Sequence, residues 1–143
     1  MGQIQLQMVD HFVSSQWWRD VMEHFVRLGD DLEIRCWKEE TEEICQASLH
    51  GTPVEARNEV SIRGTVTAEL IDELLSEEPT DKSIYNKMTK YFTINVKSER
   101  CDLCSAHYGT EMYLEGVSEE DISFFQSVIR PYDDCFRVHI EHE

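Results

Sequence analysis

One closely spaced cysteine pair, Cys101 and Cys104, is the part of this sequence that comes closest to a metal or redox motif. A C-x-x-C pair can supply two thiolates to zinc, and His107 follows three residues later as a third candidate ligand. A structural zinc site needs a full ligand set, and the remaining candidates, Cys135 and His139, belong to a predicted strand, on which residues four apart are too widely spaced to chelate easily. We therefore predict no bound metal and no cofactor, and zinc at Cys101, Cys104 and His107 is the weaker alternative.

Sequence motifs for catalysis are absent. The chain contains no G-x-S-x-G elbow, no phosphate-binding glycine loop and no dinucleotide fingerprint, and it has only six glycines. A redox role for the cysteine pair would require a helix N-terminus, which lowers a thiol pKa, whereas the sequence places this pair between two predicted strands. We predict a non-enzymatic protein. A small enzyme that uses Cys101, Cys104 or a histidine remains the third hypothesis, because catalytic partners meet in space rather than in sequence.

Acidic side chains far outnumber basic ones, 29 against 13, which gives a net charge of −16. This charge repels phosphate backbones and anionic lipid surfaces, so we predict no direct nucleic-acid binding and no membrane association. Like charges also destabilise a compact state, and a small domain needs only a modest net charge to stay soluble. A basic protein partner or a cation that neutralises part of the excess explains it most simply.

A short acidic run supplies the candidate contacts for such a partner. Segment 38–43 is predicted to be a turn, where side chains project freely. Trp18 is a further candidate, because Trp17 and Trp18 point about 100° apart on a helix, so that one can be exposed as an interface residue. The alternative is a broad apolar helix face that buries both tryptophans. The acidic candidates are Glu39, Glu40, Glu42 and Glu43.

The N-terminal half is predicted to contain the element order β-α-β-β. Residues 3–8 alternate polar and apolar side chains, which is typical of a strand with one buried face. Ser14 is a candidate N-cap for a helix whose apolar residues recur at spacings of three and four, and Gly29 can end that helix. Alternation in residues 32–36 and 45–49, on either side of the charged turn, predicts a hairpin.

Two later segments, residues 60–71 and 112–122, share one pattern of strand, glycine, valine, hydroxyl residue and acidic helix start. Thr67 and Ser118 stand at the N-cap positions of the two predicted helices. A further strand is predicted after each helix, and one more from about residue 106 to 114. Residues 57–140 are therefore predicted to form a ferredoxin-like β-α-β-β-α-β core.

The whole chain, residues 1–143, is predicted to fold as one α+β domain, because its length is near the commonest domain size and its composition is globular. The expected architecture is a largely antiparallel sheet with helices on one face, built from two or three related strand-helix-strand units. The N-terminus lacks the basic start and apolar run of a signal peptide, and no window has about 18 consecutive apolar residues. We expect a cytoplasmic protein with reduced cysteines.

No family is recognised from specific motifs. In composition only, the chain is similar to toxin-immunity proteins and phage-encoded inhibitors, which are small acidic proteins that block basic enzymes or mimic nucleic-acid charge. The first hypothesis is thus a binding protein, inhibitor-like or immunity-like, for a basic protein partner. The second is a ferredoxin-like small-molecule-binding regulatory domain, with a pocket between the repeated units or across a homodimer interface.

Overall fold

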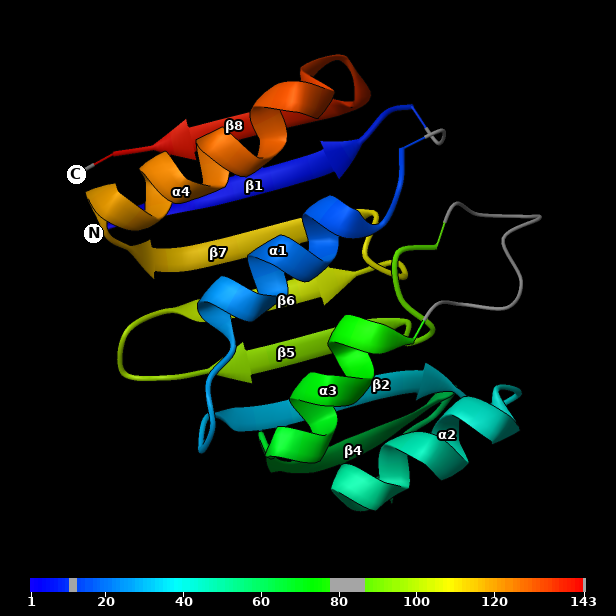
Figure 1. Ribbon diagram of the computed structural model, residues 1–143. Coiled ribbons are helices and arrows are strands. Elements are labelled where there is room, and N and C mark those ends of the chain that lie inside the picture. The colour runs from blue at the N-terminus through cyan, green and yellow to red at the C-terminus, as the bar shows by residue number, and fades with distance from the viewer. Residues whose placement is uncertain (11–12, 78–86, 143) are drawn as a thin grey trace.

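The computed structural model describes residues 1–10, 13–77 and 87–142 (Figure 1). Eight strands form one sheet in the order β3-β4-β2-β5-β6-β7-β1-β8, and each neighbouring pair is antiparallel. The predicted α+β class with a largely antiparallel sheet is confirmed. The strands are β1 (Gly2–Met8), β2 (Asp31–Trp37), β3 (Gly51–Glu55), β4 (Glu59–Thr65), β5 (Thr93–Lys97), β6 (Asp102–Ala106), β7 (Glu111–Val117) and β8 (Phe136–Glu141).

The described residues contain four α-helices, and Figure 1 shows α1, α3 and α4 lying across one face of the sheet. The helix α1 lies between the other two and buries both of its tryptophans against the sheet. Two short 3-10 helices follow α2 and α4. The helical segments are α1 (Gln16–Phe25), α2 (Thr41–Ala47), η1 (Ser48–His50), α3 (Ala68–Ser76), α4 (Glu119–Ile129) and η2 (Arg130–Cys135).

Helices α3 and α4 each connect two strands that have a third strand between them. β2 pairs antiparallel with both β4 and β5, which α3 connects, and β1 pairs antiparallel with both β7 and β8, which α4 connects. The Thr67 hydroxyl accepts the Leu70 N–H at the start of α3, and Ser118 and Asp121 form a capping box at the start of α4. Both predicted helices and both predicted N-caps are confirmed.

The predicted hairpin around residues 38–43 is wrong. Residues 41–50 form α2 and η1, and the strand that follows, β3, pairs with β4. The alternation of Cys45, Ala47 and Leu49 favoured a strand, but Cys45 and Leu49 are exposed. The face that packs is the helical pair Ile44 and Ala47, three residues apart.

The C-terminal region contains one strand more than the predicted β-α-β-β-α-β order. β6 lies between β5 and β7, so the order from β4 onward is β-α-β-β-β-α-β, and β7 begins at Glu111 rather than near residue 106. The buried positions of β6 are Leu103 and Ser105. A serine in place of a large apolar residue weakens the alternating pattern by which such a strand is recognised.

Among the described residues, the strand side chains opposite the three helices are exposed or half-buried, as is common for one face of an antiparallel sheet. Strand alternation places glutamines, glutamates and arginines on this face, together with the aromatic residues Trp37 and Tyr113 at 36% and 39% exposure. The helix-covered face carries the apolar core. The side chains that can meet a ligand or a partner through the sheet are therefore those of the open face and its ends.

Candidate functional site: an aromatic corner with two carboxylates

A cavity of about 530 Å³ lies at the end of the sheet where β1 and β2 end and β7 begins, with Phe92, just before β5, and the β6–β7 turn between them. Aromatic rings from three separate segments line it, and we call these four residues the aromatic corner: Trp37, Phe92, His107 and Tyr108. The remaining lining residues are Gln7, Met8, Thr110 and Glu111. A concave site with apolar walls and a few polar groups is the usual form of a ligand-binding site.

Phe92 holds the aromatic corner together. Its ring centroid lies 4.7 Å from that of Trp37, 5.3 Å from that of Tyr108 and 5.5 Å from that of His107. The ring planes are inclined at 48°, 72° and 44° to that of Phe92, in the tilted and edge-on arrangements that aromatic pairs favour. The walls of the cavity are therefore fixed by contacts among the rings themselves.

The turn between β6 and β7 adopts an unusual backbone conformation. His107, Tyr108 and Gly109 have φ values of +49°, +60° and +84°, so three consecutive residues lie in the left-handed region, two of them with side chains. In this region a residue with a side chain costs about 1–3 kcal/mol, and such residues concentrate at functional sites. The backbone N–H of Tyr108 donates to the Phe92 carbonyl at 3.0 Å, and the Met88 N–H donates to the Tyr108 carbonyl at 2.8 Å, which holds the turn in place.

The side chain of Trp18 packs against this turn. It is 1% exposed, and its indole N–H donates to the Ser105 hydroxyl at 3.0 Å. Trp17 is also buried, so the structure has the broad apolar helix face of the alternative, and a partner does not reach Trp18 in this conformation. The indole lies so close to Gly109 that a Cβ at Gly109 would come within 2.8 Å of its nitrogen.

Two carboxylates border the aromatic corner. Glu40 accepts the backbone N–H of Trp37 at 2.8 Å with one oxygen and the Tyr108 hydroxyl at 3.1 Å with the other. Glu111 contacts the His107 ring nitrogen and accepts the hydroxyl of Tyr113 at 2.8 Å. Negative charge next to aromatic faces creates an environment that favours a cation.

The side chain of Lys87 lies over one of these rings. The ammonium of Lys87 lies 4.1 Å from the centroid of the Tyr108 ring, within the range of a cation–π interaction. The same ring carries the hydroxyl that donates to Glu40. This contact indicates that the face of the Tyr108 ring can accommodate a cation.

The four predicted acidic residues have different positions. Glu39 and Glu42 are exposed, Glu43 is half-buried in the first turn of α2, and Glu40 is bound to the aromatic corner. The structure thus brings Glu40 to Tyr108, 68 residues later in the chain. Sequence reasoning missed Trp37, Phe92 and Tyr108 and singled out His107 only as a candidate zinc ligand, although residues 107–110 include a glycine between two alternating segments, which is a turn signal.

The cysteine pair lies at the start of β6. Cys101 is buried and Cys104 is half-buried in the strand, and the part of the chain that the structure describes has no group of three or more His, Cys, Asp or Glu side chains that could hold a metal. Burial raises the pKa of both thiols, and it raises the pKa of the Cys36 thiol to about 12. These thiols are therefore poor candidates for a nucleophile, which needs a lowered pKa.

The reactivity of the cysteines toward a thiol reagent tests whether Cys101 or Cys104 is a reactive thiol. We expect Cys45, which is exposed on α2, to react with a thiol reagent before any other cysteine of the native protein. Cys45→Ser should remove the fast phase of modification followed by mass spectrometry. Rapid labelling of Cys101 or Cys104 in the folded protein would contradict this expectation and favour the enzyme hypothesis.

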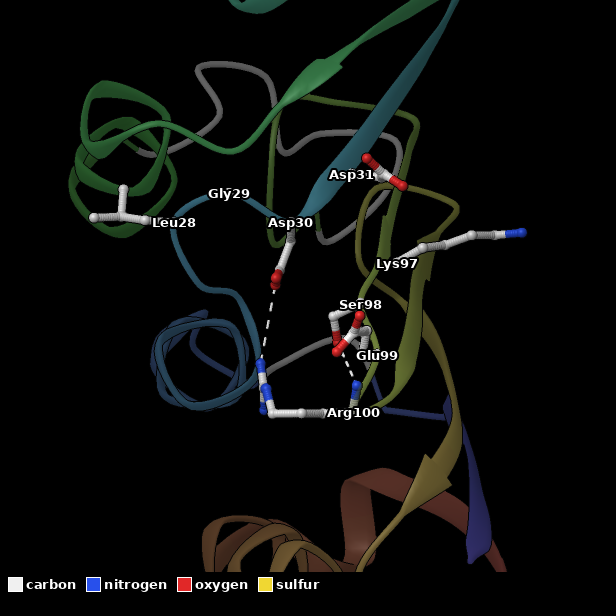
Figure 2. A pocket seen from close by; sticks show the side chains of 8 residues that line it. All are labelled: Leu28, Gly29, Asp30, Asp31, Lys97, Ser98, Glu99 and Arg100. Atoms are coloured by element: carbon white, nitrogen blue, oxygen red, sulfur yellow. Dashed lines mark hydrogen bonds and ion pairs between the residues drawn. The ribbon is translucent and has the colours of Figure 1, made fainter.

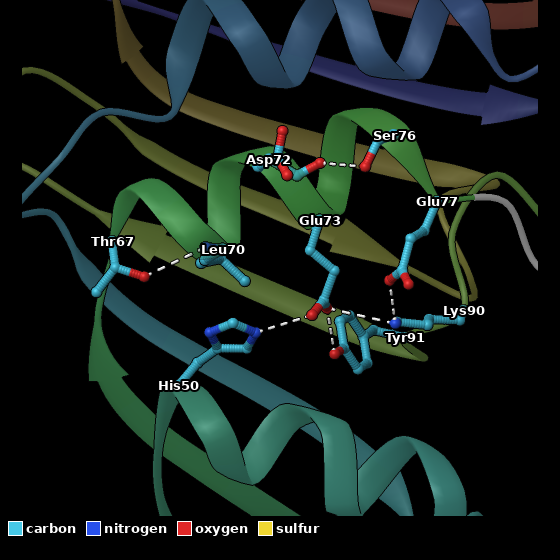
Figure 3. A network of polar contacts seen from close by, with 9 residues as sticks. All are labelled: His50, Thr67, Leu70, Asp72, Glu73, Ser76, Glu77, Lys90 and Tyr91. Atoms are coloured by element: carbon cyan, nitrogen blue, oxygen red, sulfur yellow. Dashed lines mark hydrogen bonds and ion pairs between the residues drawn. The ribbon is translucent and has the colours of Figure 1, made fainter.

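A second polar cluster surrounds Glu73 of α3 (Figure 3). Its carboxylate accepts the Tyr91 hydroxyl at 2.5 Å, lies 3.0 Å from Nε2 of His50 and lies 3.5 Å from the ammonium of Lys90. Burial acts to raise the pKa of Glu73, but the hydrogen bonds from Tyr91 and His50 outweigh it, so that the pKa is lowered. Tyr91 is fully buried and the His50 side chain is 6% exposed, so this cluster joins α3, η1 and the chain before β5 rather than facing a ligand.

A larger hollow of about 680 Å³ lies at the opposite end of β2, lined by residues 28–31 and 97–100 (Figure 2). The guanidinium of Arg100 lies 3.9 Å from the Asp30 carboxylate and donates to the Phe25 carbonyl at 3.3 Å. The Ser98 hydroxyl accepts the Arg100 N–H at 3.2 Å. These polar groups bind one another, and the hollow lacks the aromatic walls of the aromatic corner.

No helix among the described residues has both the length and the apolar character needed to cross a membrane. The aromatic corner is the site in which the structure combines a cavity, aromatic walls, carboxylates and unusual backbone conformation. Comparisons of the chain with models of known protein families, with curated proteins and with solved structures found no match.

Proposed function

We propose that this protein is a non-enzymatic binding protein for a basic protein partner, and that a lysine or arginine side chain of the partner enters the aromatic corner. The observation that carries the proposal is the cavity of about 530 Å³ that is lined by the rings of Trp37, Phe92 and Tyr108 and by Glu111, with the Glu40 carboxylate accepting the Tyr108 hydroxyl at its border. A cationic side chain is attracted both by aromatic faces and by carboxylates, whereas an anionic group would be repelled by the latter.

The charge of the chain supports the same partner. A net charge of −16 favours encounter with a basic surface and disfavours encounter with an acidic one. Glu39 and Glu42 are exposed beside Glu40, which borders the aromatic corner. The exposed glutamates that attract a basic partner and the cavity that binds its cationic side chain would then lie at the same end of the sheet.

The second candidate function is binding of a small molecule, as in the ferredoxin-like regulatory domain of the second hypothesis. The cavity volume of about 530 Å³ favours small-molecule binding, because small-molecule sites measure roughly 300–1,000 Å³. The same rings and carboxylates would then select a cationic or aromatic-stacking ligand. The two candidates differ in how binding depends on the exposed glutamates outside the cavity.

A pair of charge-removing substitutions tests the protein-partner proposal. We expect Glu39→Gln with Glu42→Gln to leave the free energy of unfolding nearly unchanged, because both side chains are exposed and exposed charges contribute little to stability. The association rate for a basic partner captured from lysate should fall several-fold at low salt and converge with the wild-type rate at high salt, because salt screens exposed charges.

The matched control is Glu23→Gln with Glu120→Gln, which removes the same charge from exposed positions on α1 and α4. This control should change the association rate less than the test pair does. An association rate that is insensitive both to salt and to the Glu39 and Glu42 substitutions would reject the protein-partner proposal and favour the small-molecule candidate.

A further inference from the structure

The two edges of the sheet differ in what they offer to an additional strand. At one edge, the Ala56 N–H donates to the Glu59 carbonyl, so strand alternation turns the backbone groups of Pro53 outward. Proline has no N–H, and a proline at an outward position of an edge strand blocks further pairing. Pro53 therefore prevents the β3 edge from pairing regularly with an additional strand.

The β8 edge has no such protection. Among the described residues β8 pairs only with β1, and the Val9 N–H donates to the Cys135 carbonyl at 2.8 Å. Strand alternation then turns the backbone groups of Arg137 and His139 toward β1 and those of Val138 and Ile140 outward. The edge thus presents N–H and C=O groups to any strand that comes alongside it.

The sequence of β8 is complementary to itself in the antiparallel direction. If a second β8 pairs with the first about a two-fold axis at His139, Arg137 faces Glu141 of the second copy, and Glu141 faces Arg137 of the second copy. These side chains lie on the open face and are exposed. Opposite charges directly across an antiparallel pair stabilise it, whereas like charges destabilise it.

The helix-covered side of the same pairing is apolar. Val138 faces Ile140 of the second copy, and both residues are only half-buried in the single chain although they pack on the core. A groove of about 420 Å³ runs beside them, with Phe125 and Ile129 of α4 in its lining. Figure 1 shows α4 lying beside β8, so that the two copies of α4 would flank the axis on the same face of the joined sheet.

The groove and β8 carry equal numbers of basic and acidic side chains, although the chain as a whole is strongly acidic. These are Arg130 and Arg137 against Asp133 and Glu141. Asp134, just before β8, and Glu119, which contacts His142 just after it, add negative charge at the two ends of the strand. The pairing residues themselves therefore add no net charge to the contact.

We propose that two copies of this chain associate through β8, antiparallel and centred on His139, to form one continuous sheet. The pairing provides main-chain hydrogen bonds between Val138 and Ile140 of opposite copies and two Arg137–Glu141 pairs. It covers the apolar groove beside α4. This inference does not depend on the proposed function, because the aromatic corner lies on other strands.

Charge exchange tests the register. Sedimentation should detect a dimer of the wild-type protein, and Arg137→Glu or Glu141→Arg alone should raise the dimer dissociation constant on the order of tenfold, because each creates two like-charged pairs. The double variant R137E/E141R should restore association close to the wild-type level. A wild-type protein that is monomeric at every concentration, or a double variant no better than the single ones, would overturn the proposal.

Cross-linking tests the axis, in a Cys45→Ser background that removes the exposed thiol. In His139→Cys the two new thiols face each other across the axis, with Cα atoms about 4.5 Å apart, which suits a disulfide. In the control Arg137→Cys the new thiols are offset by four residues, about 13 Å. Diamide should cross-link the first variant and not the second, and equal cross-linking of both would contradict the register.

A proline substitution tests the edge itself. Val138→Pro removes an outward N–H, and should abolish the dimer while leaving the pairing with β1 intact. The matched control is Glu55→Pro, which removes an outward N–H from the β3 edge and should leave the dimer unchanged. Circular dichroism and thermal unfolding check that both variants fold. A dimer that survives Val138→Pro would place the interface elsewhere.

Discussion

Gly109→Ala is expected to destabilise the protein by about 2–5 kcal/mol, the sum of a left-handed backbone cost and of overpacking. Gly109 has a φ of +84°, and a Cβ there would lie 2.7 Å from the Cβ of Met88 and 2.8 Å from the indole nitrogen of Trp18. Neither neighbour moves easily, because Trp18 is buried and hydrogen-bonded to Ser105. Urea unfolding measures the effect.

Gly29→Ala is the matched control for this substitution. Gly29 has a similar φ of +88°, but a Cβ there would meet nothing within 4 Å. The control should therefore lose only the backbone contribution, about 1–2 kcal/mol. Equal losses at the two positions would show that the contact between the β6–β7 turn and α1 does not constrain the turn, and the fixed shape of the aromatic corner would lose its support.

Glu73→Ala is the second substitution with a large expected effect, a loss of about 2–5 kcal/mol. It leaves the buried hydroxyl of Tyr91 and the ring of His50 without the carboxylate that accepts their hydrogen bonds, and it leaves Lys90 with one fewer acidic neighbour. The control Asp72→Ala removes an exposed carboxylate from the same helix and should cost far less. Comparable losses would mean that the Glu73 cluster does not hold α3 in place.

The Glu73 cluster also predicts a pH dependence. Because the folded-state pKa of Glu73 lies below its ordinary value of 4.5, its contribution to stability is fully present above that value and is lost as the pH falls through the folded-state pKa. Glu33 and Asp121 have pKa values lowered from 4.5 and 3.8 and act in the same direction. The free energy of unfolding should fall in acid, and Glu73→Gln should reduce that fall.

Short-range sequence patterns predicted several strands and helices of this fold. Alternation identified β1, β2 and β8, and the N-caps Thr67 and Ser118 located α3 and α4, because these signals depend on a few adjacent residues. Segment 45–49 failed because its short pattern fits both a strand and a helix, and only the packing of Ile44 and Ala47 on the sheet decides between them. Sheet order depends on long-range pairing, which the sequence does not encode locally.

The candidate site was harder to predict for the same reason. The sequence predicts Glu40 as an acidic contact, but Tyr108, which donates to it, and Phe92, which packs on Tyr108, come from distant segments that the sheet brings together. The sequence allows either an exposed Trp18 or two buried tryptophans, and both are buried, because α1 packs a wide apolar face on the sheet. Composition predicts a basic partner, and the proposed function places a cationic side chain of that partner in the cavity at the aromatic corner.

A two-dimensional NMR titration with Nα-acetyl-lysine methylamide tests the central claim most directly. The uncharged analogue with norleucine in place of lysine is the matched control ligand. The indole N–H of Trp37, a residue that lines the cavity, is the reporter, and the indole N–H of the buried Trp17, which packs against Phe136, is the internal reference. The account predicts saturable shifts of the Trp37 signal with the lysine ligand only, weakened by Glu111→Gln. No shift at Trp37, or equal shifts with both ligands, would contradict a cation-binding aromatic corner.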